Sequence, residues 1–127
     1  ELEMHFLLQK DSSKTRSVLH VHPTHVVAAM YAGWKLDEIA KQFPELHRYS
    51  RVGKSVPILP VTSAQLAKAT YSAMTDAESG ILIYDIVGQD RHGVCSVARD
   101  PWSAYEHVER LEHICEIVLK SGVNPKK

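Results

Sequence analysis

A short run of alternating residues, 17–22, constrains the fold of this chain most strongly. Its β-branched and aliphatic residues are typical of a strand, and Pro23 directly after it is suited to opening a helix. Successive side chains of a strand point to opposite faces, so His20 and His22 share one face, roughly 6.5–7 Å apart along it. Two imidazoles at that separation can bind one ion, at about 2.0–2.1 Å from each nitrogen.

A third histidine lies far downstream in the sequence. His92 belongs to the segment Asp90-Arg-His-Gly-Val94, where a glycine turn leads toward an expected strand at residues 94–98. Three histidines that leave one coordination position open are the ligand set of a catalytic zinc rather than of a structural zinc. A His-x-His pair alone is a weak signal, and histidines simply packed in a sheet are the alternative interpretation. The pattern makes His20, His22 and His92 candidate metal ligands.

The composition is that of one globular domain with an ordinary core. Of the 127 residues, 44% are hydrophobic and 24% are charged, and 15 Lys and Arg balance 15 Asp and Glu. This balance gives no electrostatic reason to expect nucleic acid or an anionic membrane as a partner. No apolar run approaches the roughly 20 residues of a membrane span. Cys95 and Cys115 have no pairing signature or CxxC spacing, so we expect free thiols and a cytoplasmic protein.

Strand and helix signals alternate along the chain and predict an α/β fold. Ser63 and Asp100 are suitable N-cap residues, while Gly33 and Gly122 are suitable helix-ending glycines. The proline-containing segment 44–60 is expected to be a loop with scattered strand signals. Helices are predicted at residues 1–9, 23–32, 36–43, 63–74 and 101–122, and strands at 17–22, 80–84 (a buried strand) and 94–98.

Glutamate and histidine follow a defined spacing from the start of the chain. Glu1 stands four residues before His5 and nineteen before His20, and His92-Gly93 follows the apolar residues 81–84. This order resembles the class II, zinc-dependent aldolases, which act on ketose 1-phosphates and share a fold with adducin. In that family a catalytic glutamate opens a helix, a histidine follows four residues later, and a metal-binding His-x-His comes after the next strand. The family's third ligand sits in a His-Gly pair.

The resemblance covers nearly the whole chain. The closing helix, residues 104–119, is similar to the family's last helix, and residues 53–69 are most similar to rhamnulose-phosphate aldolases. The spacing around Glu1 is similar to that of fuculose-phosphate aldolases. Residues 85–91 form a longer link before the His-Gly pair than the family usually has.

The resemblance implies a three-layer α/β/α fold with a central, mostly antiparallel sheet. In the family, further residues precede the catalytic glutamate and carry part of the sheet and the loops that bind the substrate phosphate. Residues 1–127 are therefore expected to be the C-terminal, metal-binding portion of a larger class II aldolase/adducin-like domain.

The site residues follow from the resemblance by position. His20, His22 and His92 are expected to hold one Zn²⁺ per subunit, and Glu1 is expected to be the catalytic acid/base. Glu45 falls near the position at which rhamnulose-phosphate aldolases place a second acid, which reaches into a neighbouring subunit. The alignment needs a gap there, and a solvated loop glutamate is the alternative. The resemblance also implies that the protein is a homotetramer.

The implied reaction is retro-aldol cleavage of a deoxyketose 1-phosphate, of the rhamnulose or fuculose type, to dihydroxyacetone phosphate and an aldehyde. A pentulose-phosphate 4-epimerase or a dehydratase of the same fold is an alternative, although the epimerases carry aspartate where this chain has Glu1. A non-catalytic adducin-like module is another, although such domains lack the metal histidines.

The other histidines and the closing helix have simpler interpretations. His25 is expected in the core or on a helix surface, and His5 either beside Glu1 and the metal or packed. His47, His107 and His113 are expected to be solvated. The charged side of the closing helix, which includes Glu112 and Glu116, is expected to serve solubility.

Overall fold

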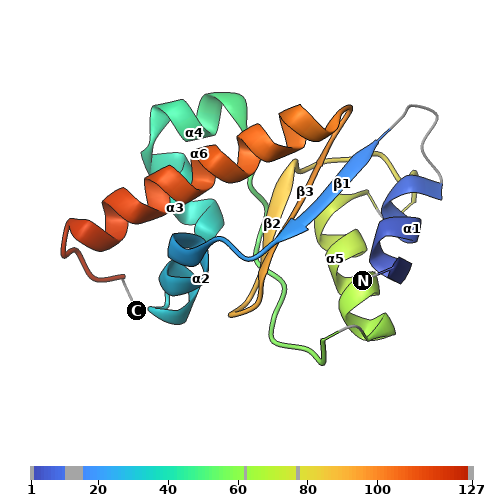
Figure 1. Cartoon of the computed structure of the whole chain (residues 1–127), viewed down its shortest axis with the longest axis horizontal. Coiled ribbons are helices and arrows are strands. Elements are labelled where there is room, and N and C mark those ends of the chain that lie inside the picture. The colour runs from blue at the N-terminus through green and yellow to red at the C-terminus, as the bar shows by residue number, and fades with distance from the viewer. Residues whose placement is uncertain (1, 11–15, 62, 77, 126–127) are drawn as a thin grey trace.

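A three-stranded antiparallel sheet, with strands in the order β1-β3-β2, lies between two groups of helices (Figure 1). The computed structural model describes residues 2–10, 16–61, 63–76 and 78–125. Their elements are α1 (Leu2–Lys10), β1 (Ser17–Val21), α2 (Thr24–Tyr31), α3 (Leu36–Gln42), α4 (Pro44–Tyr49), α5 (Ala64–Met74), β2 (Ile86–Gln89), β3 (Gly93–Ala98) and α6 (Pro101–Lys120). The predicted α/β fold, with helices on both sides of a sheet, is confirmed.

Each face of the sheet has its own hydrophobic core. Helices α2, α3, α4 and α6 cover one side, which we call the α6 face, and α1 and α5 cover the other, the α1 face (Figure 1). The central strand β3 supplies both cores because its side chains alternate. Val94 is buried on the α6 face, whereas Cys95 and Val97 are buried on the α1 face. His20 lies opposite Cys95 in the β1–β3 register, so it belongs to the α1 face.

Helix α6 forms as its sequence predicts. The Asp100 side chain accepts a hydrogen bond from the Ser103 backbone N–H at 2.7 Å, and Pro101 occupies the first turn, where its missing N–H is not needed. Its buried residues recur every three or four positions and form one apolar stripe. They are Ala104, Val108, Leu111, Ile114, Cys115 and Val118. This helix fixes the α6 face of the sheet.

The prediction of a buried strand at residues 80–84 is wrong. The strand is β2, Ile86–Gln89, and Ile81 is 64% exposed. Gly80 has a φ of 71°, a left-handed conformation typical of a turn. Leu82 pairs only through an isolated bridge with Thr75. The apolar run therefore belongs to a turn and a short connection.

Gly88 explains why the sequence concealed the true strand. A Cβ on Gly88 would lie 2.6 Å from Met30 Sδ and 2.7 Å from Leu36 Cδ1, so any other residue would force these side chains of α2 and α3 to shift away from β2. The position of β2 also removes the long link expected before His92. Residues 86–89 are strand, and only a short turn remains.

The prediction of a loop at residues 44–60 is correct only in part, because α4 occupies Pro44–Tyr49. Pro44 is suited to the first turn of a helix, and Leu46 is fully buried in the core of the α6 face. Beyond α4, Val52 and Val56 form isolated parallel bridges with β2. These bridges account for the strand signals in this segment.

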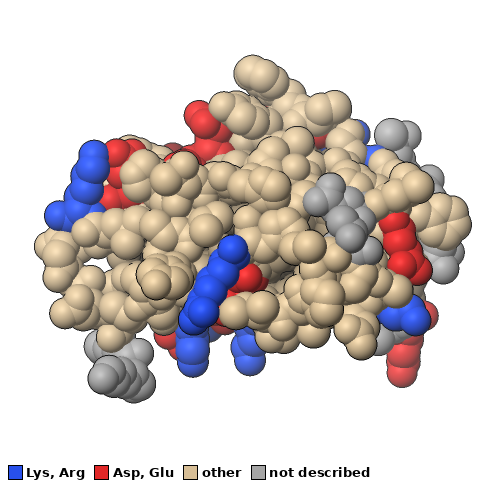
Figure 2. Space-filling model, turned by 60° about the horizontal axis from the view of Figure 1, so that its bottom comes forward, with Lys and Arg blue, Asp and Glu red and all other residues tan. Residues whose placement is uncertain are grey.

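The surface carries charges of both signs. Figure 2 shows basic and acidic side chains interspersed across one face rather than gathered into a stripe of one sign. This distribution agrees with the equal numbers of acidic and basic residues in the sequence.

Among the described residues, no helix has the length and apolar character needed to cross a membrane.

His107 is not solvated as predicted. It is half-buried on α6, where it faces the end of α4. The Ser50 Oγ lies 2.6 Å from His107 Nδ1, and Arg110 Nη1 donates to the same hydroxyl at 2.7 Å. Since the hydroxyl accepts from Arg110, its own proton is free to be donated to an unprotonated Nδ1. Burial lowers the pKa of His107 below its ordinary value of 6.5, and the nearby Arg110 also lowers it, while Asp85 opposes the shift.

His107 should therefore make the fold acid-sensitive. The unfolded chain binds a proton at His107 more readily than the folded chain does, so stability is retained above pH 6.5 and lost as the pH falls below it. We expect His107→Asn, which keeps an acceptor for Ser50, to flatten the loss measured by urea unfolding across this range. The exposed His47→Asn is the control and should behave as wild type. Equal slopes for wild type and His107→Asn would contradict this account.

Candidate metal centre

Three histidines meet at one end of the β1–β3 pair. The ligand nitrogens of His20, His22 and His92 all lie within 4.8 Å of one another. His20 Nε2 and His92 Nε2 are 3.3 Å apart, and each pair of rings has centroids 4.9 Å apart. His20 and His92 are half-buried, while His22 is exposed. His92 thus joins two histidines that precede it by 70 or more positions in one compact cluster, whose exposed member is His22.

His20 is oriented by a backbone carbonyl of the neighbouring strand. Its Nδ1 lies 2.9 Å from the Val94 carbonyl oxygen. A carbonyl can only accept, so Nδ1 carries a proton, and in the neutral imidazole Nε2 then holds the lone pair. That lone pair belongs to the nitrogen that meets His92. Metal-binding histidines characteristically donate their other ring N–H in this way.

His22 lies just beyond the end of β1. If the β1–β3 register is continued by one residue, His22 falls opposite Gly93. A Cβ on Gly93 would lie 2.4 Å from the Val21 carbonyl oxygen and 2.7 Å from His22 Cδ2. Gly93 is therefore required for its backbone to approach the backbone at Val21 and the ring of His22 this closely.

His92 lies in the turn that joins β2 to β3. Gln89 pairs with Gly93, and the His92 N–H donates to the Gln89 carbonyl at 2.9 Å, which closes a tight turn. Arg91 has a φ of 58°, a left-handed conformation that costs a non-glycine residue about 1–2 kcal/mol. Its guanidinium lies 5.4 Å from the centre of the Tyr31 ring. The turn thus holds a strained residue directly before the candidate ligand.

The three nitrogens suit a small divalent cation. A tetrahedral zinc with bonds of about 2.0–2.1 Å holds two ligand nitrogens roughly 3.3–3.4 Å apart. The separation of 3.3 Å between His20 Nε2 and His92 Nε2 matches that spacing before any adjustment. Three neutral imidazoles, with the exposed side left open, can hold an ion and leave a position for a further ligand. The donor set therefore fits zinc.

A buried thiol beside the cluster is a poor ligand by comparison. Cys95 is the cross-strand neighbour of His20 and is fully buried. Burial raises the pKa of its thiol to about 12, so the thiolate form is suppressed. Cys95 and Cys115 are both free.

The structure describes one of the two predicted catalytic glutamates. Glu1 lies outside the described residues. Glu45 is exposed at the start of α4, on the face of the sheet opposite to that of His20. Within one chain, the structure does not bring Glu45 to the three histidines. His5, on α1, is half-buried.

Glu112 is a contributor that sequence reasoning missed, because it was predicted to serve solubility alone. Its carboxylate accepts hydrogen bonds from the backbone N–H groups of His25 and Val26, at 2.9 and 3.0 Å. It also lies 2.7 Å from the His25 ring Nδ1. A signal was present in the sequence: Pro23 opens α2, and the first turn contains no acid and no side-chain cap. Such a helix start needs an acceptor from elsewhere.

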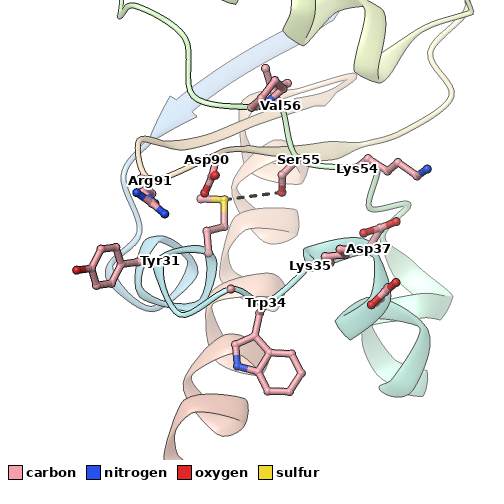
Figure 3. Close-up of a pocket in the computed structure, with 13 residues that line it drawn as sticks. Tyr31, Trp34, Lys35, Asp37, Lys54, Ser55, Val56, Asp90 and Arg91 are labelled. Atoms are coloured by element: carbon pink, nitrogen blue, oxygen red, sulfur yellow. Dashed lines mark hydrogen bonds between the residues drawn. The ribbon is translucent and has the colours of Figure 1, made fainter. Parts of the chain in front are cut away.

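A cavity of about 450 Å³ lies beside the same hairpin but is separate from the histidines (Figure 3). Tyr31 and Trp34 come from the α2–α3 region, Ser55 from the segment beside β2, and Asp90 and Arg91 from the hairpin turn. None of the three histidines lines it. The candidate metal centre is instead the histidine cluster at the end of the β1–β3 pair.

Comparisons with known proteins identify relatives of this arrangement. The model of the class II aldolase and adducin N-terminal domain family matches residues 1–119. The chain is similar in structure to a sugar-phosphate aldolase from Thermotoga maritima, with a TM-score of 0.74 and 26% identity over 97% of this chain and 55% of that one. The L-fuculose-1-phosphate aldolase from Thermus thermophilus gives a TM-score of 0.74 and 18% identity, over 100% of this chain and 65% of that one.

The chain spans little more than half the length of the first of these relatives, 55% of it. A comparison of the sequence with curated proteins found no match.

We expect Gly93→Ala to disrupt the cluster, because the added methyl group would displace the Val21 carbonyl and the His22 ring. The variant should lose most of its affinity for cobalt(II), a spectroscopic substitute for zinc, measured by visible absorption. Gly122→Ala is the control: its φ of 77° strains the backbone, but a Cβ there meets no atom within 4 Å. It should lose stability and keep its affinity. Unchanged cobalt binding in Gly93→Ala would contradict the close-approach argument.

Proposed function

The chain belongs to the class II aldolase and adducin family, and from that premise we propose that it carries the metal centre of a carbon–carbon lyase. The observation that supports this proposal best is the cluster of His20, His22 and His92. The adducin-like alternative is disfavoured because such domains lack the metal histidines, all three of which are present and close together here. Structural likeness to a sugar-phosphate aldolase agrees with this choice.

We propose that the substrate is a deoxyketose 1-phosphate of the rhamnulose or fuculose type. In the retro-aldol direction, the bond between C3 and C4 breaks, C4 becomes the aldehyde carbon as its hydroxyl loses a proton, and C3 takes the electron pair. A proton returned to C3 then gives dihydroxyacetone phosphate. The products follow from this balance of atoms.

We assign metal binding to the three histidines and proton transfer to one glutamate. A zinc ion held by the histidines would act as a Lewis acid on the C2 carbonyl oxygen. Val94 keeps the Nε2 lone pair of His20 available for that ion through its hydrogen bond to Nδ1. We assign the proton transfer at C3 to Glu1, on the basis of the family resemblance and its spacing from His5 and His20 in the sequence.

The whole protein's organisation is also a proposal. Residues 1–127 would be one portion of a larger domain, which their partial coverage of the relatives supports. The homotetramer and the role of Glu45 across a subunit boundary rest on the resemblance, and the exposure of Glu45 is compatible with that role. Assays therefore require the intact natural protein.

Metal analysis and product analysis together test the proposal. The wild-type protein should contain close to one zinc ion per chain, and His20→Ala and His92→Ala should lose it because each removes one of three donors. His113→Ala, which removes an exposed histidine of α6, is the control and should keep it. Full occupancy in both cluster variants would exclude this metal site.

With added zinc and a panel of ketose 1-phosphates, release of dihydroxyacetone phosphate supports the aldolase. Interconversion of pentulose phosphates would point to an epimerase instead, and absence of both turnover and metal to a binding module.

Glu1→Gln should separate the chemical step from binding. Because the residue would move a proton without holding the metal, zinc occupancy and KM should remain near wild type, while kcat falls about 10²–10⁴-fold. Glu3→Gln, at an exposed position of α1, is the control and should be fully active. Solvent-proton exchange into dihydroxyacetone phosphate measures the step without an aldehyde. Wild-type exchange in Glu1→Gln would transfer the role to another group.

A further inference from the structure

We propose that Glu112 is a positioning residue for His22, which it holds by capping the helix that begins directly after that ligand. This inference rests on the proposed metal centre. It assigns a role to a side chain of α6 that lies outside the histidine cluster.

The start of α2 depends on Glu112. The first N–H groups of any helix have no partner within the helix. In α2 the N-cap residue is Pro23, which makes no side-chain cap, and the first turn holds no acid. Glu112 supplies the missing acceptor: Oε1 accepts from His25 N–H at 2.9 Å and from Val26 N–H at 3.0 Å. A carboxylate at a helix N-terminus is also favoured by the helix dipole.

Glu112 is itself held in a rigid position. Its neighbours on α6, Leu111 and Cys115, are fully buried in the core of the α6 face. Only about a quarter of the Glu112 side chain is exposed. The carboxylate therefore links the start of α2 to a helix whose apolar stripe is buried in the core of the α6 face.

His22 lies between two fixed points of the backbone. On one side, Val21 is paired with Val94 in the ladder. On the other side, Glu112 holds the backbone at His25 and Val26. His22 belongs to neither β1 nor α2 and is exposed, so nothing in its own element fixes its backbone. Metal sites need their ligands within about 0.5 Å of the productive geometry, which the two flanking contacts would provide.

The same carboxylate engages another histidine of this segment. His25 Nδ1 lies 2.7 Å from Glu112 Oε2. This contact draws the His25 ring toward α6 rather than toward the cluster, although His25 follows His22 by only three residues. Glu112 thus engages the ring of His25, the histidine that follows the candidate ligand His22 in the sequence.

Cobalt(II) titration of the metal-free protein, followed by visible absorption, tests the inference. Glu112→Ala should bind cobalt about 10-fold more weakly than wild type, the lower end of the effect of removing a group bonded to a ligand, because Glu112 acts on His22 only through the backbone. Two controls separate positioning from general stability. Asp100→Ala removes the cap of α6 instead of α2, and Glu116→Gln removes a carboxylate one turn away that bonds Lys120. Both should bind as wild type below their unfolding temperatures.

Equal affinity in wild type and folded Glu112→Ala would overturn the inference, and so would an equal loss in Asp100→Ala. If Glu112→Ala fails to fold, Glu112→Gln decides: its affinity must fall below that of Glu116→Gln, which has the same charge change, and equal affinities overturn the inference. A wild-type protein that binds no cobalt would overturn the metal centre itself, and the role of Glu112 with it. That result can be distinguished from one in which wild type and Glu112→Ala bind cobalt equally well, which would overturn only the role of Glu112.

Discussion

The antiparallel pairing of β1 with β3 is the interaction on which the site depends. It sets His20 opposite Cys95 and Val21 opposite Val94, and it places the turn that carries His92 beside the end of β1. A slip of one residue would move every side chain of β1 to the other face of the sheet. His20 would then exchange the α1 face for the α6 face. The two cores prevent this slip, since Val18 packs on one face while Leu19 and Val21 pack on the other.

The centre is built from backbone geometry as much as from histidines. Gly93 lets β1 and β3 approach more closely than a Cβ would permit. The Val94 carbonyl accepts from Nδ1 of His20 and so fixes which ring nitrogen is protonated. Arg91 has a left-handed φ directly before His92. Each feature either lowers the stability of the fold or restricts which residue can occupy the position. Such costs concentrate where side chains must be held in one arrangement. The strain at Arg91 beside a candidate ligand fits that pattern.

Sequence reasoning succeeded where a pattern is local and failed where packing decides. The strand at residues 17–22 and the helix after Asp100 follow from alternation and capping, and alternation alone set His20 and His22 on one face. The strand at residues 86–89 was missed because two of its four residues, Gly88 and Gln89, give no strand signal. Their reasons are tertiary: Gly88 lies against Met30, and Gln89 bonds Thr70. The cap provided by Glu112 was missed for the same reason.

Gln89 shows how the helices of the α1 face are tied to the hairpin. The side chain is 1% exposed, and its Nε2 donates to Thr70 Oγ1 of α5 at 2.9 Å and contacts Met4 Sδ of α1 at 3.2 Å. Its Oε1 has no hydrogen-bond partner among the described residues, a burial that costs about 1–3 kcal/mol. An apolar side chain would avoid that cost but would not select one placement of α1. Gln89 precedes His92 by three residues, so its contact with Met4 ties α1 to the hairpin that carries this candidate ligand.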